Sequence, residues 1–203
     1  MIRGFRDKKT ESVFSGEMVK DFSGFRKVAE RKLTMLDSAL DLKDLLSPAG
    51  NRLEKLRGDR VGQHSIRIND QLRIFLSGRL TDPMRSKSPI ITEGDHAMIK
   101  NGMRPVHPGE ILFEEFMKPS EPPINANILA KALEVPSNRV TAIIKGQRGI
   151  TGDTAVRLAT FFNTTAEFWR NLQKTYELRL AERAFSGKVI KHIEQHRDRL
   201  VSA

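Results

Sequence analysis

One short segment carries side chains that suit contact with the bases of DNA. At 100° per residue, the apolar side chains of residues 137–145 fall on one face of a helix, which leaves the opposite face polar, cationic and free of bulky groups. An arginine can form two hydrogen bonds to guanine, an asparagine can do the same with adenine, and an alanine lets the helix approach closely. The residues that we predict to contact DNA are Ser137, Asn138, Arg139, Thr141, Ala142, Lys145 and Arg148.

To contact DNA, the polar face of residues 137–145 must point away from the domain, as it does in the second helix of a helix-turn-helix. The preceding segment Asn127–Leu133 has the pattern of a short amphipathic helix, and the small side chain of Ala130 would let the two helices pack closely. Ser137 is the expected N-cap of the second helix, because its hydroxyl can accept a hydrogen bond from a free backbone N–H. The alternative is an ordinary solvated face of a helical bundle, which a basic amphipathic helix also fits.

More helices are predicted around this pair. Thr164, followed three residues later by Glu167, matches a capping box that opens a helix. Phe168 and Leu172 then share one face and are expected in the core, whereas Trp169 is a candidate interface anchor. The helical segments that periodicity predicts in this half are Pro108–Lys118, Asn127–Leu133, Asn138–Lys145, Gly152–Phe162, Ala166–Ala184 and Lys188–Leu200.

The N-terminal half has a different pattern, which predicts helices on a small antiparallel sheet. Apolar residues recur at helical spacing over Gly24–Leu40. Short alternating or β-branched runs separated by turn residues predict strands at Ile2–Arg6, Arg52–Leu56, Gln63–Ile68 and Leu72–Leu76. Residues 78–103 are rich in Gly, Pro and Ser and show little periodicity, so we expect a linker between a domain at 1–77 and a domain at 104–203.

The composition excludes several classes of chemistry. The 203 residues include no cysteine, which rules out disulfides, thiolate zinc sites and cysteine nucleophiles. His192 and His196 lie four residues apart but lack a third ligand, so we expect no metal and no cofactor. The net charge of +10 favours a polyanionic partner. Because we find neither a long apolar run nor a signal-like start, we expect a cytoplasmic protein with no membrane partner.

The C-terminal half resembles a known family over nearly its whole length. The matching stretches are RPVHPGEIL (104–112), LAKALEVPSNRVTAIIKGQRGIT (129–151), DTAVRLATFFNTTAEFWRNLQ (153–173) and YELRLAE (176–182). Together they resemble the HigA antitoxins, which are Xre-type repressors. The resemblance implies an all-α, lambda-repressor-like helix-turn-helix domain that forms a homodimer, binds its own operator DNA and neutralises a partner toxin. Glu134 stands where the family usually has a glycine, and a left-handed backbone there would cost about 1 kcal/mol.

The stretch GNRLEKLRGDRVGQHSIRINDQLRIF (50–75) resembles the HigB toxins of the RelE-like superfamily. This resemblance implies an α+β domain that cuts messenger RNA on the ribosome without a metal. It also implies that Arg57 and Arg73 stabilise phosphate and that Glu54 is a weaker acid-base candidate, since in-line attack on a phosphate needs cations and a proton carrier. The alternative is that these arginines are a solvated face of the sheet.

The toxin-like half departs from its family at its end. Family toxins finish with a strand that reads approximately D-V-x-x-x-D-Y-H. Residues 77–103 match this motif only weakly, and His96 is the one catalytic candidate that they offer. Leu72 also replaces the usual tryptophan. A frameshift near Ser77 would explain both departures and would inactivate the nuclease. Whether this half is an enzyme is therefore left open. In the alternative, Ile90 and Ile91 still form a degenerate strand and His96 still reaches the site.

We therefore expect an antitoxin-repressor that carries a degenerate toxin-like domain in the same chain. The main alternative is an active messenger-RNA endonuclease that its fused antitoxin holds inactive, with messenger RNA and the ribosome as further partners. A third reading is purely structural, with the toxin-like half only shaping a dimer.

Overall fold

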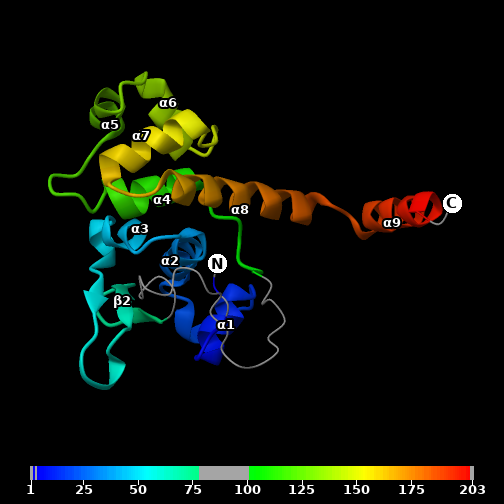
Figure 1. The fold of residues 1–203 in the computed structure, drawn as a ribbon, viewed down its shortest axis with the longest axis horizontal. Coiled ribbons are helices and arrows are strands. Elements are labelled where there is room, and N and C mark those ends of the chain that lie inside the picture. The colour runs from blue at the N-terminus through cyan, green and yellow to red at the C-terminus, as the bar shows by residue number, and fades with distance from the viewer. Residues whose placement is uncertain (1, 3, 78–100, 202–203) are drawn as a thin grey trace.

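The computed structural model describes residue 2, residues 4–77 and residues 101–201. Within them, a part that combines helices with a small sheet is followed by a part made of helices, and Figure 1 shows the second part above the first. The small antiparallel sheet with its helices and the helical region agree with the expected fold class. The α-helices of these residues are α1 (Lys8–Phe14), α2 (Arg26–Ser38), α3 (Lys43–Leu46), α4 (Pro108–Ile111), α5 (Ala126–Ala132), α6 (Ser137–Ile144), α7 (Gly152–Phe162), α8 (Ala166–Ala184) and α9 (Gly187–Val201).

The sheet of the described residues is an antiparallel meander, as predicted. Its strands, β1 (Glu54–Lys55), β2 (His64–Arg67) and β3 (Arg73–Leu76), lie in the order β1-β2-β3. Ile66 of β2 is fully buried and lies opposite Ile74 of β3, so this face of the sheet belongs to the core. Side chains alternate between the faces of a strand, and therefore the neighbouring residues Ser65 and Arg73 lie on the other face.

The predicted strand at Ile2–Arg6 is wrong, since residues 2 and 4–6 form no strand. The backbone N–H of Ile2 donates instead to Asp37 Oδ1 over 2.7 Å. The ring of Phe5 packs on Phe14 of α1, with 5.2 Å between ring centroids. The side chains of Ile2 and Phe5, whose alternation suggested a strand, are partly buried against the hydrophobic core instead.

The helices of the second half begin at local capping signals. Asn125 caps α5, and Thr151 caps α7 by accepting a hydrogen bond from Thr154 N. Thr165, rather than the predicted Thr164, caps α8 by accepting from Phe168 N. Helix α4 continues as a π-helix over Leu112–Met117. Every helical segment predicted in this half is confirmed, with bounds that agree within two residues.

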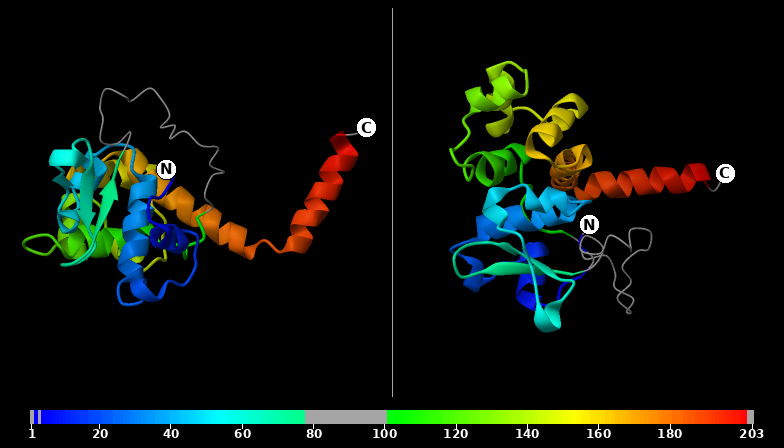
Figure 2. Two further views of the ribbon diagram at one scale, coloured as in Figure 1. Left: turned by 90° about the horizontal axis from the view of Figure 1, so that it is seen from below. Right: turned by 60° about the vertical axis from the view of Figure 1, so that its left-hand side comes forward.

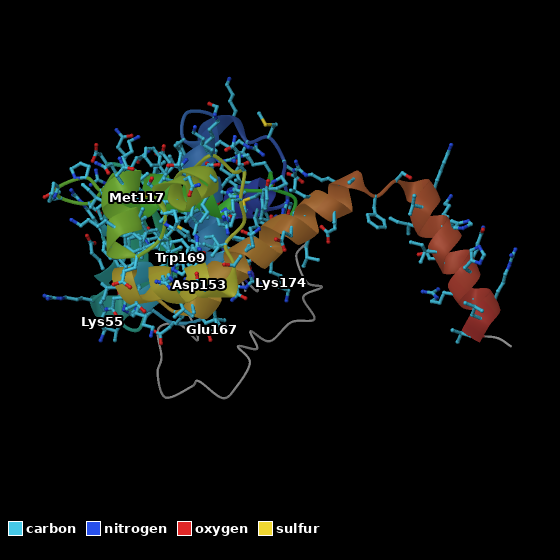
Figure 3. The ribbon with its side chains drawn as sticks, turned by 90° about the horizontal axis from the view of Figure 1, so that it is seen from above. Lys55, Met117, Asp153, Glu167, Trp169 and Lys174 are labelled. Atoms are coloured by element: carbon cyan, nitrogen blue, oxygen red, sulfur yellow. The ribbon has the colours of Figure 1, made fainter. Side chains whose placement is uncertain are left out.

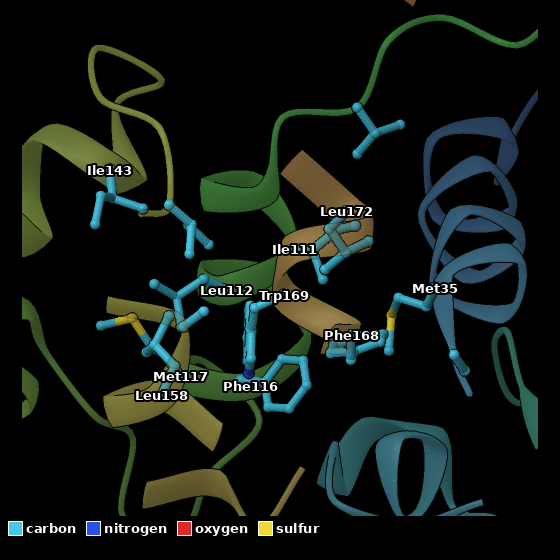
Figure 4. Close-up of a cluster of buried hydrophobic side chains, with 14 of the residues drawn as sticks. Met35, Ile111, Leu112, Phe116, Met117, Ile143, Leu158, Phe168, Trp169 and Leu172 are labelled. Carbon is cyan, nitrogen blue, oxygen red and sulfur yellow. The ribbon is translucent and has the colours of Figure 1, made fainter. Parts of the chain in front are cut away.

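An aromatic cluster forms the core of the helical half (Figure 4). Phe116, Phe168 and Trp169 are buried, and the Phe116 and Trp169 rings lie 4.8 Å apart. Trp169 Nε1 donates to Thr164 Oγ1 over 2.9 Å, so its polar atom is satisfied inside the protein. The predictions for Phe168 and Leu172 are confirmed, and the candidate role of Trp169 as an interface anchor is wrong, because its side chain is fully buried.

The two halves pack against each other through α2 and α8 (Figures 1 and 2). Met35 of α2 lies beside Phe168 of α8 in the same buried cluster (Figure 4). Asp44 of α3 accepts hydrogen bonds from both the backbone N–H and the hydroxyl of Thr165, at the start of α8. Negative charge at a helix N-terminus is favourable, so Asp44 stabilises α8 from across the junction.

The junction also contains buried charges. Glu115 Oε1 accepts from Arg31 Nε over 2.6 Å, and Glu115 Oε2 lies 2.5 Å from Lys32 Nζ. Both side chains from α2 therefore meet one carboxylate from the helical half. Lys32 Nζ also donates to Asn51 Oδ1 over 2.6 Å. Burial lowers the pKa of Lys32, while the carboxylate of Glu115 opposes that shift.

The end of the predicted linker is packed into this junction. The backbone N–H groups of Gly102 and Met103 both donate to the carbonyl oxygen of Phe14. A side chain at Gly102 would overlap Ser15, because a Cβ there would lie 1.8 Å from the Ser15 carbonyl oxygen. The rest of the predicted linker, residues 78–100, lies outside the described residues, as do Ile90, Ile91 and His96.

Helix α8 runs out of the body, and α9 lies beyond it (Figure 2). The side chains of α9 are exposed along the whole helix (Figure 3). Across the described residues, no helix combines the length and the apolar character that crossing a membrane requires.

Candidate nucleic-acid interface

Helices α5 and α6 form the predicted helix-turn-helix. Leu129 and Ala130 of α5 pack with Val140 and Ile143 of α6, and all four are buried. Between the helices, Glu134 has a φ of +54°, so the backbone is left-handed at the position where the related family usually has a glycine. The cost of such a residue is about 1 kcal/mol, which the packing of the two helices can offset.

The outward face of α6 is open. Ser137, Asn138 and Lys145 are exposed, as is Arg148 just beyond the helix. Arg139, Thr141 and Ala142 on the same helix are half-buried. In Figure 1, α5 and α6 lie at the top of the molecule and the sheet lies at the bottom, so the toxin-like half leaves this face uncovered.

Ser137 is the first residue of α6, and the predicted N-cap role is wrong. Pro136 occupies the cap position and supplies no side-chain hydrogen bond. The carbonyl oxygen of Ser137 accepts a hydrogen bond from Thr141 Oγ1 over 3.0 Å. Ser137 is exposed at the start of α6.

Arg139 has a partner that the sequence analysis missed. Its Nη1 donates to Asp153 Oδ2 over 2.7 Å, and Asp153 lies in the first turn of α7. Asp153 Oδ1 accepts from Arg157 Nε over 3.0 Å. These contacts hold the pKa of the Asp153 carboxyl below its usual value, chiefly through Arg157 and then through Arg139. No spacing rule links residues 139 and 153, which meet only because α6 and α7 fold together.

The candidate catalytic residues of the sheet are only partly brought together. Arg73 Nη1 lies 3.2 Å from Glu54 Oε1, so these two predicted residues form an ion pair. Arg73 Nε donates to Ser65 Oγ over 2.9 Å, and Arg73 Nη2 donates to the carbonyl oxygens of Arg52 and Ser65. All three guanidinium nitrogens therefore bind groups of the sheet itself.

Arg57 stands apart from this pair. It is exposed and precedes the short 3-10 turn Gly58–Arg60. At the end of that turn, Arg60 places its guanidinium 4.8 Å from the ring centroid of Phe75, which is itself half exposed. The fourth candidate, His96, lies outside the described residues.

Metal-binding groups are sparse in the described part of the chain. Residues 2, 4–77 and 101–201 hold no cluster of three or more His, Cys, Asp or Glu side chains that could bind a metal ion. The rings of His192 and His196 lie 4.5 Å apart on α9.

Comparison with known proteins assigns a family to each half. A family model described as the RelE-like toxin of type II toxin-antitoxin system HigB matches residues 3–78. Toxin HigB-1 of Vibrio cholerae is 38% identical over 77 residues, which cover 37% of this chain and 81% of that protein.

Further relatives include a virulence-associated protein and an antitoxin. Virulence-associated protein I of Dichelobacter nodosus is 49% identical over 83 residues, which cover 41% of this chain and 75% of that protein. Antitoxin HigA-1 of Vibrio cholerae is 38% identical over 81 residues, which cover 40% of this chain and 74% of that protein. A solved structure of the Pseudomonas aeruginosa antitoxin HigA with the higBA promoter is 48% identical and covers 44% of this chain and 94% of that one, with a TM-score of 0.41.

Toxin HigB-1 and Antitoxin HigA-1 of Vibrio cholerae thus each match this chain over more than two thirds of their own length. The resemblances inferred from the sequence of the two halves are confirmed. The chain belongs to the HigB–HigA toxin–antitoxin family and carries a HigB-like toxin region and a HigA-like antitoxin region in one polypeptide.

Proposed function

We propose that this chain is a DNA-binding antitoxin-repressor that recognises its own operator through the outward face of α6. The observation that carries the proposal is the open, polar and cationic face of that helix, formed by Ser137, Asn138, Lys145 and their flanking residues. Its place in the second helix of a helix-turn-helix suits entry into a major groove. The HigA-like sequence of this half supports the same function.

The individual contacts follow from the chemistry of each side chain. Arg139 and Asn138 have the donors and acceptors to read base edges. Lys145 and Arg148 lie at and beyond the end of α6, where we assign them to phosphates. Ala142 and Thr141 present little bulk and let the helix sit deeply in the groove.

The chain binds DNA as a homodimer in this proposal. Two copies related by a twofold axis would present two α6 helices to successive major grooves, so the operator is a palindrome with half-sites about one helical turn apart. The domain limits at 1–77 and 104–203 and a cytoplasmic location belong to the same proposal.

The toxin-like half is, in this proposal, a degenerate domain that the antitoxin half covers. Every guanidinium nitrogen of Arg73 binds the sheet, which supports a structural role for this residue rather than a phosphate-binding one. The alternative of an active messenger-RNA endonuclease held inactive by its antitoxin is not favoured.

A competition experiment tests the proposal. The full chain is titrated by fluorescence anisotropy against a duplex from the region upstream of its own gene, and against a random duplex of equal length at the same physiological salt. We expect the upstream duplex to bind at least about 10³-fold more tightly. Equal affinity for the two duplexes would overturn the proposal.

A further inference from the structure

The rotamer of Arg139 is fixed by an anion on another helix. Arg139 Nη1 and Asp153 Oδ2 are 2.7 Å apart, which is the distance of a charge-assisted hydrogen bond. The Arg139 side chain is about one quarter exposed, whereas Asp153 is about half exposed. Only one of the five guanidinium donors is used in this contact, so enough donors remain for a base.

Asp153 is itself held in place. Its second oxygen accepts from Arg157 Nε over 3.0 Å, and Arg157 Nη1 donates to the carbonyl oxygen of Leu133 over 2.8 Å. Leu133 is the C-cap of α5, and Arg157 lies one turn after Asp153 on α7. The contacts therefore run from the end of α5 through Arg157 and Asp153 to Arg139 on the recognition helix.

We propose that Asp153 is a positioning residue for DNA specificity, which orients the Arg139 guanidinium for one guanine of the operator. This inference rests on the proposed function. An unrestrained arginine loses much side-chain entropy when it is fixed on a base, and a guanidinium already held by a carboxylate loses less. A held guanidinium also presents its remaining donors in one direction, which suits the two acceptors on the edge of a guanine.

The negative charge of Asp153 has a second effect. A carboxylate beside the recognition helix repels phosphates, and this repulsion does not depend on the DNA sequence. Asp153 should therefore weaken binding to all DNA while it strengthens the preference for the operator. A residue that only stabilised the fold would affect operator and random DNA alike.

The test is the specificity of the full chain with Asp153→Ala. Affinity is measured for the upstream duplex, for a random duplex, and for upstream duplexes with each base pair replaced in turn. We expect Asp153→Ala to bind random DNA as tightly as the unmodified chain or more tightly, and to reduce the preference for the upstream duplex about tenfold. The lost discrimination should map to one base pair in each half-site.

A matched control separates this effect from charge and helix stability. Glu167 is an exposed acidic residue in the first turn of α8, as Asp153 is in the first turn of α7, and both are labelled in Figure 3. Glu167→Ala removes the same charge from an equivalent position and should leave the preference for the upstream duplex unchanged. Asp153→Asn keeps a hydrogen-bond acceptor and should retain part of the discrimination.

The Arg139→Ala background decides whether Asp153 acts through Arg139. Adding Asp153→Ala to Arg139→Ala should not reduce the preference further. The inference is overturned if Asp153→Ala keeps full discrimination, if it weakens both duplexes equally, or if its effect persists without Arg139. Those results, together with an unmodified chain that prefers its upstream duplex, leave the proposed function intact. An unmodified chain with no preference overturns both.

Discussion

At the scale of single residues, the side chains on the outward face of α6 differ in what they can recognise. Arg139 is held in one direction by Asp153, whereas Lys145 is exposed at the end of the helix. A guanidinium with fixed direction can distinguish bases, while a flexible ammonium contacts phosphates without regard to sequence.

Substitution of these two residues should therefore have different consequences. Arg139→Ala should cost roughly 1 to 3 kcal/mol of operator binding and relax the sequence preference. Lys145→Ala should weaken operator and random DNA by similar factors and lower the slope of log affinity against log salt by about 1. Anisotropy titrations at several salt concentrations measure both effects, and equal, sequence-independent losses from the two variants would contradict the assignment.

His107 provides a second prediction at this scale. Its Nδ1 accepts a hydrogen bond from Gly109 N over 2.9 Å at the start of α4, which only the neutral ring can do at that atom. Burial lowers the pKa of His107 below its usual 6.5, although Glu110 opposes the shift. The folded state therefore binds the proton less readily than the unfolded state does. The stability that this group contributes is present above pH 6.5 and is lost as the pH falls through the lower, folded-state value.

His107→Asn should remove this part of the pH dependence, because an asparagine can cap the helix without titrating in this range. Urea unfolding between pH 8 and pH 5 should show a smaller loss of stability in the variant than in the unmodified chain. His192→Asn changes an exposed histidine of α9 and is the control. An unchanged pH profile in His107→Asn would show that the cap is not coupled to protonation.

At the scale of elements, the junction between α2 and the helical half depends on a buried carboxylate. Glu115 is 3% exposed and faces both Arg31 and Lys32. Removing one partner of a buried charge group leaves the others uncompensated. Glu115→Ala should therefore lower the free energy of unfolding by about 3 to 5 kcal/mol.

The neighbouring Glu114 offers a matched control. It pairs with Lys118 over 3.3 Å near the surface, so Glu114→Ala should cost at most about 1 kcal/mol. Denaturant unfolding of the full chain measures both variants. If Glu115→Ala were as mild as Glu114→Ala, the charge group would not stabilise the junction.

Most elements were predictable because their signals are local. Turn residues and periodicity gave α7 and α8 with the observed bounds, and the strands of the meander follow from alternating runs between turns. The N-caps at Ser137 and Thr164 were misplaced by one residue: Pro136 holds the cap position of α6, and Thr165, which is adjacent to Thr164 and can cap equally well, caps α8. The strand at Ile2–Arg6 failed because Ile2 bonds to Asp37 of α2 and Phe5 packs on Phe14 of α1, contacts that an alternating pattern alone does not reveal.

The candidate site was less predictable, because it depends on contacts between distant residues. Helical periodicity was enough to place Val140 and Ile143 inside and Asn138 and Lys145 outside. The pairing of Arg139 with Asp153 and the burial of Trp169 both require the packed arrangement of several helices. For the same reason, the sequence did not indicate that the Arg73 guanidinium would donate hydrogen bonds to Ser65 and Arg52.

At the scale of the whole molecule, the solubility of the toxin-like half depends on its contacts with the helical half. Residues Met35, Arg31 and Lys32 of α2 are buried in the full chain by contacts with the helical half. A fragment of residues 1–97 would expose this apolar and charged surface, so it should be poorly soluble. Expressed alone, it should not arrest growth, and Arg73→Ala should change nothing in that assay. Growth arrest that Arg73→Ala relieves would show that the nuclease is still active.

In the proposed complex, two copies of α6 read one operator in successive major grooves. A hydroxyl-radical footprint of the full chain on the DNA upstream of its own gene shows whether they do. We expect two protected patches on one face of the duplex, about one helical turn apart between their centres, within a palindromic sequence. Protection spread evenly along the duplex, or a single patch with no symmetric partner, would contradict it.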